Sequence, residues 1–105
     1  MGGMEARLYE TDTGRSQPRD FLDDLPVHER AAILDDIADY AAGASGAVSW
    51  KVISGHAPMR ELRTWGFRSL FFVQGDVMHV LHVCRKQDQK RGIEQAAKRM
   101  KALRQ

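Results

Sequence analysis

The sequence predicts an α+β domain in which helices pack on one antiparallel-rich sheet of four to five strands. Two observations predict this fold class. Apolar residues recur at helical spacing near both ends of the chain, which is typical of amphipathic helices. Between residues 59 and 90 they instead form short runs separated by two tight turns, which is typical of a strand meander. Because the helices are segregated from the meander, an α+β arrangement is favoured.

The size and composition indicate one globular domain. The chain has 105 residues, enough for one modest core, so we expect residues 1–105 to fold as a single unit. No apolar run is long enough to span a bilayer, and residues 1–10 lack the apolar segment of a signal peptide. Cys84 is the only cysteine, which fits a reducing compartment. We therefore expect a cytoplasmic protein that makes no membrane contact.

The N-terminal half is expected to hold one strand and two helices. Residues 6–10 form a short alternating run and are the candidate first strand. Ser16 can cap a short helix that carries Pro18 in its first turn. Pro26 begins a second helix, whose apolar stripe ends before Gly43, a residue suited to follow a helix C-terminus.

The C-terminal half is expected to hold most of the sheet and a last helix. Residues 49–53 form a candidate strand, residues 54–58 a flexible link and residues 59–90 the meander. The last helix begins at Gly92, and its apolar residues are expected to face the core. Its basic residues are expected mostly outside the core: Lys98, Arg99, Lys101 and Arg104.

The first turn of the meander places two arginines opposite each other. Trp65-Gly66 makes a plausible two-residue hairpin loop, so that Arg63 stands opposite Arg68 on one face of the sheet. Like charges that are directly opposed are destabilising unless an anion lies between them. A polyanionic partner is one explanation, and pairing of the arginines with Glu61 or with acids on the helices is the other.

The second turn decides which face His82 occupies. A three-residue loop at residues 74–76 places His82 opposite Arg68, with Lys86 on the same face. A two-residue loop shifts the register by one and sends His82 and Lys86 to the other face. A predicted cluster of Arg63, Arg68, His82 and Lys86 therefore depends on the three-residue loop.

Such a cluster has the parts needed to cleave RNA. The 2′-hydroxyl of RNA supplies the nucleophile, so the protein must place a base, cations for the phosphorane oxygens and an acid for the leaving oxygen. Arg63 and Arg68 suit the phosphate oxygens, His82 is the candidate base, and Lys86 is the candidate acid or charge stabiliser. The alternative is structural: ion-paired arginines, a satisfied and partly buried His82, and a solvated Lys86 at a strand end.

Charge is distributed unevenly along the chain. Residues 1–43 contain ten acidic residues and four arginines, whereas residues 44–105 contain twelve lysines or arginines and four acidic residues. The basic half is the better candidate for contacting RNA, although a solvated face would show the same pattern. The further candidate RNA contacts are Lys51, Arg60, Arg85, Lys90 and Arg91.

The sequence does not favour base stacking by the tryptophans, metal binding or cofactor binding. Trp50 and Trp65 are expected to pack in the fold in preference to stacking on bases, and Cys84 is expected in the core. No metal site is expected, because His79 and His82 point to opposite faces of a strand. No cofactor is expected, because the chain has no glycine-rich phosphate loop, Cys-x-x-Cys or His-Glu-x-x-His motif.

Several segments, taken in order, resemble bacterial type II toxins of the RelE/HigB superfamily, in its phage-derived HigB-like branch. They are GRSQPRDFLDDLP, MRELR, GFRSLFFVQGD, VLHVCRKQDQK and IEQAAKRM, and the resemblance covers nearly the whole chain. It implies a compact RelE-like fold and a ribosome-dependent mRNA endoribonuclease that inhibits translation. It also implies neutralisation by a helix-turn-helix antitoxin, with operator DNA bound only through the antitoxin complex.

The resemblance implies roles for individual residues. Arg63 falls on the arginine of the Glu-Leu-Arg strand, and Arg68 falls on a phosphate-stabilising arginine that follows an aromatic residue. Arg85 and Lys86 fall on a basic pair where relatives place a general acid. His82 matches the histidine of the branch's Leu-Leu-His pattern.

Two positions depart from RelE itself. RelE has a lysine base where this chain has Glu61, and no tyrosine follows Tyr40 in the position where RelE stacks its substrate. Glu61 and His82 are both candidates for the base, and the ordinary histidine pKa of ~6.5 favours His82. The alternative function is a non-nuclease binding module of the same fold, either a gyrase-inhibiting ParE-like toxin or an antitoxin-binding co-repressor.

Overall fold

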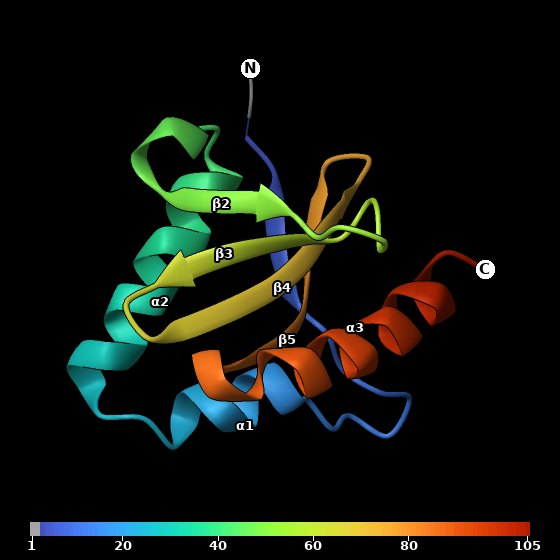
Figure 1. Cartoon of the computed structure of the whole chain (residues 1–105), viewed down its shortest axis with the longest axis horizontal. Helices are drawn as coiled ribbons and strands as arrows, with labels where there is room; N and C mark the ends of the chain where they lie inside the picture. Colours follow the sequence, from blue (N-terminus) through green and yellow to red (C-terminus); the bar gives the residue numbers. More distant parts are fainter. Residues whose placement is uncertain (1–2) are drawn as a thin grey trace.

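The computed structural model describes residues 3–105, and within them the chain forms a five-stranded sheet and three α-helices (Figure 1). The strand order is β1-β5-β4-β3-β2, in which β1 runs parallel to β5 and the other neighbours are antiparallel. The strands are β1 (Glu5–Leu8), β2 (Ser49–Val52), β3 (Arg60–Thr64), β4 (Phe67–Gln74) and β5 (Val77–Arg85). The helices are α1 (Gln17–Asp23), α2 (Val27–Ala41) and α3 (Gln89–Leu103). The predicted α+β class, with two helices before the meander and one after it, is confirmed.

The helices cover both faces of the sheet, with α2, α1 and α3 arranged around it in Figure 1. Apolar residues of α1 and α2 form one core with alternate strand residues such as Leu62 and Phe71. Residues of α3 form a second core on the opposite face with Leu70, Phe72 and Leu81. Each fully buried leucine or phenylalanine stabilises the fold by about 1.5–3 kcal/mol, so both layers contribute to stability. No helix within residues 3–105 is long and apolar enough to cross a membrane.

The ends of the first two helices follow their predicted local signals. Ser16 Oγ accepts a hydrogen bond from the Arg19 amide at 3.2 Å, and Pro18 lies in the first turn of α1. α2 begins directly after Pro26. Gly43, which follows α2, has a φ of 91° and so adopts the left-handed conformation expected beyond a helix C-terminus.

Three predicted boundaries are shifted. β1 covers Glu5–Leu8 and not residues 6–10. β2 ends at Val52, because the Ile53 amide instead donates to the Met59 carbonyl at 2.9 Å and closes the following loop. α3 begins at Gln89, three residues before Gly92, because a 3-10 turn, labelled η2 (Lys86–Asp88), leads directly into the helix.

The first turn of the meander has the predicted register. Thr64 pairs with Phe67, and Arg63 pairs with Arg68. The two-residue loop between them is Trp65-Gly66, and Trp65 has a φ of 53°. A left-handed residue in this position matches the right-handed twist of the two strands, which is why such loops are common in hairpins.

The second turn is tighter than predicted. Gln74 pairs with Val77, so the loop contains only Gly75 and Asp76. Gly75 has a φ of 63°, a conformation that a two-residue hairpin loop requires at its first position and that glycine adopts without steric cost. The three-residue loop is therefore wrong. Taken alone, the shorter loop would turn His82 to the opposite face.

A β-bulge in β5 reverses that shift. Phe71 pairs with Val80, and Leu70 pairs with His82, so Leu81 is an extra residue without a partner on β4. Leu81 is fully buried in the core beneath α3. Burial of the Leu81 side chain favours the bulge. In a regular strand Leu81 and the adjacent His82 would point to opposite faces, so one of them would be turned away from α3.

The bulge leaves only part of the predicted cluster geometry in place. His82 shares a face with Arg68, as predicted, but the residue directly opposite Arg68 is Cys84. The predicted position of Lys86 on the strand is wrong, because β5 ends at Arg85 and Lys86 begins η2. The four residues of the predicted cluster therefore do not stand in one continuous row.

Candidate functional site

The end of the β3–β4 hairpin carries two arginines with different surroundings. Arg63 donates from Nε to Glu61 Oε2 at 2.7 Å, and 42% of its side chain is exposed. Arg68 is only 8% exposed and donates from Nη1 to the carbonyl oxygens of Trp65 and Phe67, at 3.1 and 2.9 Å. Among residues 3–105, no carboxylate forms an ion pair with Arg68. Arg68 is thus a nearly buried cation held by neutral acceptors, which favours an external anion.

Glu61 is the anion that balances Arg63. Its side chain is fully buried, and its two oxygens accept hydrogen bonds from Arg63 and from the side-chain amide of Gln89. The structural interpretation of Arg63, pairing with Glu61, is therefore confirmed. Because both oxygens are engaged and the group has no exposed surface, Glu61 is poorly placed to take a proton from a substrate.

His82 lies beneath α3 and contacts Arg99. Its Nδ1 lies 2.8 Å from Arg99 Nη1, an arrangement in which the guanidinium donates to the neutral imidazole. Burial, together with the positive charge of Arg99, lowers the pKa of His82 to about 4. At neutral pH the ring is uncharged and one nitrogen is already occupied, so His82 is a weak candidate for the base.

Four basic residues gather where β3 and β5 end and β4 begins. Lys86 is exposed, and its amide donates to the Gly66 carbonyl at 2.8 Å, which ties the end of β5 to the β3–β4 turn. Arg85 is exposed and pairs with Phe67, whose ring lies 5.2 Å from the Arg85 guanidinium carbon. We call these residues the basic end of the sheet: Arg63, Arg68, Arg85 and Lys86.

The other predicted RNA contacts are scattered over the molecule. Arg60 points to the opposite face, where it donates to the Tyr40 hydroxyl, and its guanidinium carbon lies 5.1 Å from the Trp50 ring. Lys51 is exposed on the edge strand β2, and the two candidates in the first turn of α3 are also exposed. Those two are Lys90 and Arg91. Arg60 is therefore a packing residue, whereas the other three are free to contact a ligand.

The two tryptophans differ in their surroundings. Trp50 packs edge-on against Tyr40, with ring centroids 5.4 Å apart, as expected of a packing residue. Trp65 is 64% exposed and packs only in part, against the His28 ring, with ring centroids 6.3 Å apart. It is the only non-glycine residue with a positive φ in the described part of the chain, a conformation that costs about 1–3 kcal/mol. A strained, exposed aromatic ring thus lies on the turn between Arg63 and Arg68.

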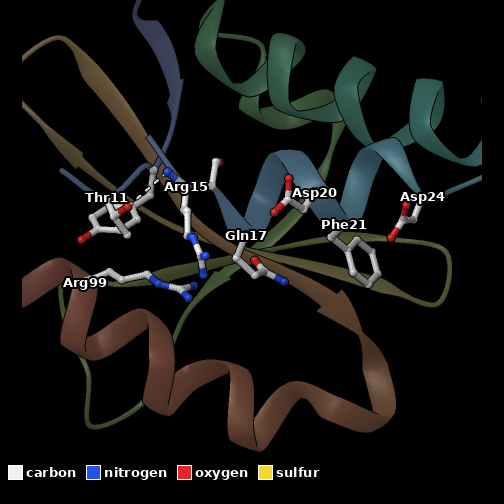
Figure 2. A pocket seen from close by; sticks show the side chains of 9 residues that line it. Thr11, Arg15, Gln17, Asp20, Phe21, Asp24 and Arg99 are labelled. Atoms are coloured by element: carbon white, nitrogen blue, oxygen red, sulfur yellow. Dashed lines mark hydrogen bonds between the residues drawn. The ribbon is translucent and has the colours of Figure 1, made fainter. Parts of the chain in front are cut away.

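A second basic site, which sequence reasoning missed, lies in a cleft between α1 and α3 (Figure 2). The cleft has a volume of about 400 Å³. Arg15, just before α1, and Arg99, on α3, both reach into it. The expectation that Arg99 lies outside is wrong, because its Nη1 donates to the Leu81 carbonyl at 2.9 Å as well as to His82. The sequence carried no signal for this contact, since it depends on the bulge.

The cleft lies beside the part of β5 that extends beyond the end of β1. There the Gln17 side chain takes the place of a neighbouring strand, because its amide nitrogen donates to the Val83 carbonyl at 2.8 Å and its oxygen accepts from the Val83 amide at 3.1 Å. Tyr9, at the end of β1, donates its amide to the Val80 carbonyl at 2.8 Å. These contacts cap the strand edge with protein groups and fix the position of α1 beside it.

Comparison with known proteins supports a family and a fold. A family model described as "Phage derived protein Gp49-like (DUF891)" matches residues 20–101. Among solved structures, a chain of the RelB-RelE antitoxin-toxin complex from Methanococcus jannaschii is similar, with a TM-score of 0.57 and 19% sequence identity. The similarity covers 79% of this chain and 95% of that chain, and at this identity it concerns the fold alone. A search of curated proteins found no match.

Proposed function

The chain belongs to the phage-derived Gp49-like family, and from this membership and the RelE-like fold we propose that it is the toxin of a type II toxin–antitoxin pair. We propose further that it is a HigB-like, ribosome-dependent mRNA endoribonuclease. The basic end of the sheet carries this proposal: Arg68 is nearly buried, has no ion-pair partner within residues 3–105, and lies near exposed cations. Guanidinium groups in such a setting suit a phosphate diester.

In the proposed reaction, the 2′-oxygen of RNA attacks the adjacent phosphorus. A bond forms between the 2′-oxygen and phosphorus, and the bond between phosphorus and the 5′-oxygen breaks. The products are a 2′,3′-cyclic phosphate and a 5′-hydroxyl. Arg63 and Arg68 stabilise the charge that develops on the non-bridging oxygens, and Lys86 protonates the leaving oxygen or stabilises its charge. The scheme uses no metal ion or cofactor.

The geometry argues against both candidates for the general base. His82 has a pKa of about 4 and its Nδ1 is held by Arg99, and Glu61 is fully buried. We therefore assign removal of the 2′-hydroxyl proton to solvent hydroxide, and the protein's main contribution becomes electrostatic stabilisation. The cleavage rate should then rise with pH without an inflection near about 6.5, where an ordinary histidine titrates.

Trp65 is proposed to stack on a base next to the scissile phosphate. Its ring is mostly exposed, and its backbone carbonyl accepts a hydrogen bond from Arg68, so the ring and the phosphate-binding cation are held in one turn. Stacking of a base on an aromatic side chain contributes about 1–3 kcal/mol to single-strand binding and tolerates any sequence. The left-handed backbone of Trp65 supports this role, because strained conformations persist where they position a functional group.

The proposed partners are a helix-turn-helix antitoxin and mRNA on the ribosome, with operator DNA contacted only through the antitoxin complex. A second candidate function is a non-nuclease binding module, either a gyrase-inhibiting toxin or a co-repressor. One observation favours it: the two candidate bases, Glu61 and His82, are both engaged by protein donors. In that case the basic end of the sheet would be a contact surface for a partner.

Mapping of mRNA 5′ ends after brief induction separates the two functions. Wild type is expected to produce new cuts within translated frames, whereas Arg68→Lys, which keeps the charge but loses the forked geometry, should produce few or none. Arg19→Gln is the matched control, because Arg19 is an exposed arginine paired with Glu10 at 3.2 Å and lies outside the basic end. Circular dichroism of each purified variant checks folding. Growth arrest by wild type with intact mRNA would contradict the nuclease function and favour the binding module.

A further inference from the structure

Two arginines from different segments converge in the α1–α3 cleft. Figure 2 shows the guanidinium groups of Arg15 and Arg99 pointing toward each other across it. Arg15 lies in the loop before α1, and Arg99 lies on α3, so the fold alone brings them together. Like charges held close together are unfavourable without a bound anion. The convergence therefore requires an explanation other than packing.

Arg99 is held in one geometry by neutral groups. Its Nη1 donates to the Leu81 carbonyl at 2.9 Å and lies 2.8 Å from His82 Nδ1, and its guanidinium carbon lies 5.7 Å from the Tyr9 ring centroid. These contacts use one nitrogen, so the other two guanidinium nitrogens are available to a ligand. Burial leaves the charge of Arg99 only partly hydrated and lowers its pKa.

No carboxylate of the described chain neutralises this pair. The ion pairs found among residues 3–105 involve three other arginines, which are Arg7, Arg19 and Arg63. Asp20, on α1, and Asp24, just after it, also line the cleft, but neither forms an ion pair with a described residue. The end of the cleft that holds Arg15 and Arg99 is thus a positively charged recess in which the Arg99 guanidinium is already oriented.

We propose that this recess binds a phosphate group, which the two guanidinium groups hold between them. Forked guanidinium donors match phosphate oxygens, and the cleft, at about 400 Å³, lies within the size range of small-molecule sites. Thr11 lies beside Arg15, whose amide donates to Thr11 Oγ1 at 3.1 Å, so the loop that carries Arg15 is itself ordered. The site is separate from the basic end, and its existence does not depend on the nuclease activity.

The phosphate could belong to an RNA backbone or to a free phosphate compound. Two aromatic residues connect the recess to the basic end of the sheet. Phe21 lines the cleft and makes an edge contact with Phe67, with ring centroids 6.1 Å apart. Phe67 in turn lies beneath the guanidinium of Arg85. A single strand bound at the basic end can therefore extend past Phe67 and Phe21 toward Arg15 and Arg99.

Calorimetric titration of the full-length protein with inorganic phosphate, at constant ionic strength set with chloride, tests the site. Wild type is expected to show saturable phosphate binding at this recess, and Arg15→Gln should weaken that binding at least about tenfold, because a charge-assisted hydrogen-bonding pair is lost. Arg15 is the residue to change, because it is exposed and its replacement should not disturb folding. Arg19→Gln removes the same charge from a neighbouring exposed position and should leave the dissociation constant unchanged.

A labelled single-stranded RNA oligonucleotide distinguishes the two sources of the phosphate. If Arg15→Gln weakens both phosphate and RNA binding, the ligand is a backbone phosphate; if it weakens phosphate binding alone, the ligand is a free phosphate compound. Absence of saturable phosphate binding by wild type, or an equal loss in Arg15→Gln and Arg19→Gln, overturns the proposal. These outcomes are independent of the Arg68→Lys mRNA mapping, so failure of the phosphate site and failure of the nuclease function can be told apart.

Discussion

Replacing Gly92 by alanine tests how closely α3 packs on β5. A glycine inside a helix ordinarily costs about 0.5–1 kcal/mol relative to alanine, so Gly92→Ala would stabilise an isolated helix. In this fold, however, the new Cβ would lie 2.9 Å from His82 Cδ2 and 3.0 Å from Cys84 Sγ. Neither neighbour can move freely, because Arg99 holds the imidazole and Cys84 is buried. Overpacking of this kind costs about 1–3 kcal/mol, which exceeds the gain in helix propensity.

Urea denaturation followed by circular dichroism measures this change. Gly92→Ala is expected to lower the free energy of unfolding by about 1–2 kcal/mol, and the melting temperature by roughly 4–15 °C for a domain of this size. Gly46→Ala is the matched control, because no atom lies within 4 Å of a Cβ built there, and it should change stability by less than about 0.5 kcal/mol. If Gly92→Ala is as stable as wild type or more stable, α3 does not pack against His82 and Cys84 as described.

Three further predictions concern single side chains. Because the pKa of His82 falls from 6.5 to about 4 on folding, the unfolded chain binds a proton in this pH range that the folded protein does not. The free energy of unfolding should therefore fall as the pH decreases from 6.5 to 4, and His82→Gln should make it less dependent on pH in a series of urea melts. Trp65→Ala should weaken binding of single-stranded RNA by about 5- to 150-fold in an anisotropy titration and leave the urea midpoint nearly unchanged, whereas Trp50→Ala, which removes packing against Tyr40, should do the reverse. Burial raises the pKa of Cys84 to about 11, so mass spectrometry should detect iodoacetamide labelling at pH 8 only after unfolding, and rapid labelling of the folded protein would contradict its burial.

The order of the elements could be predicted from the sequence because its signals are local. Apolar spacing indicated the helices, and Ser16 and Gly43 indicated two of their ends. Trp65-Gly66 defined the first hairpin, and with it the pairing of Arg63 with Arg68. In each case the residues that decide the structure are within a few positions of one another, so no distant contact had to be known.

The composition of the candidate site was decided only by tertiary structure. Two-residue and three-residue loops at Gly75 are both compatible with the local sequence, and the bulge at Leu81, which returns His82 to the Arg68 face, depends on burial beneath α3. Arg99, which contacts His82, lies 17 residues further along the chain. Such contacts join segments that are distant in the sequence, and their free energies come from burial and hydrogen bonding that no local pattern records. The sequence alone determined the elements and the first hairpin, whereas only the packing of α3 on the sheet decided that the expected base is a partly buried, neutral partner of an arginine.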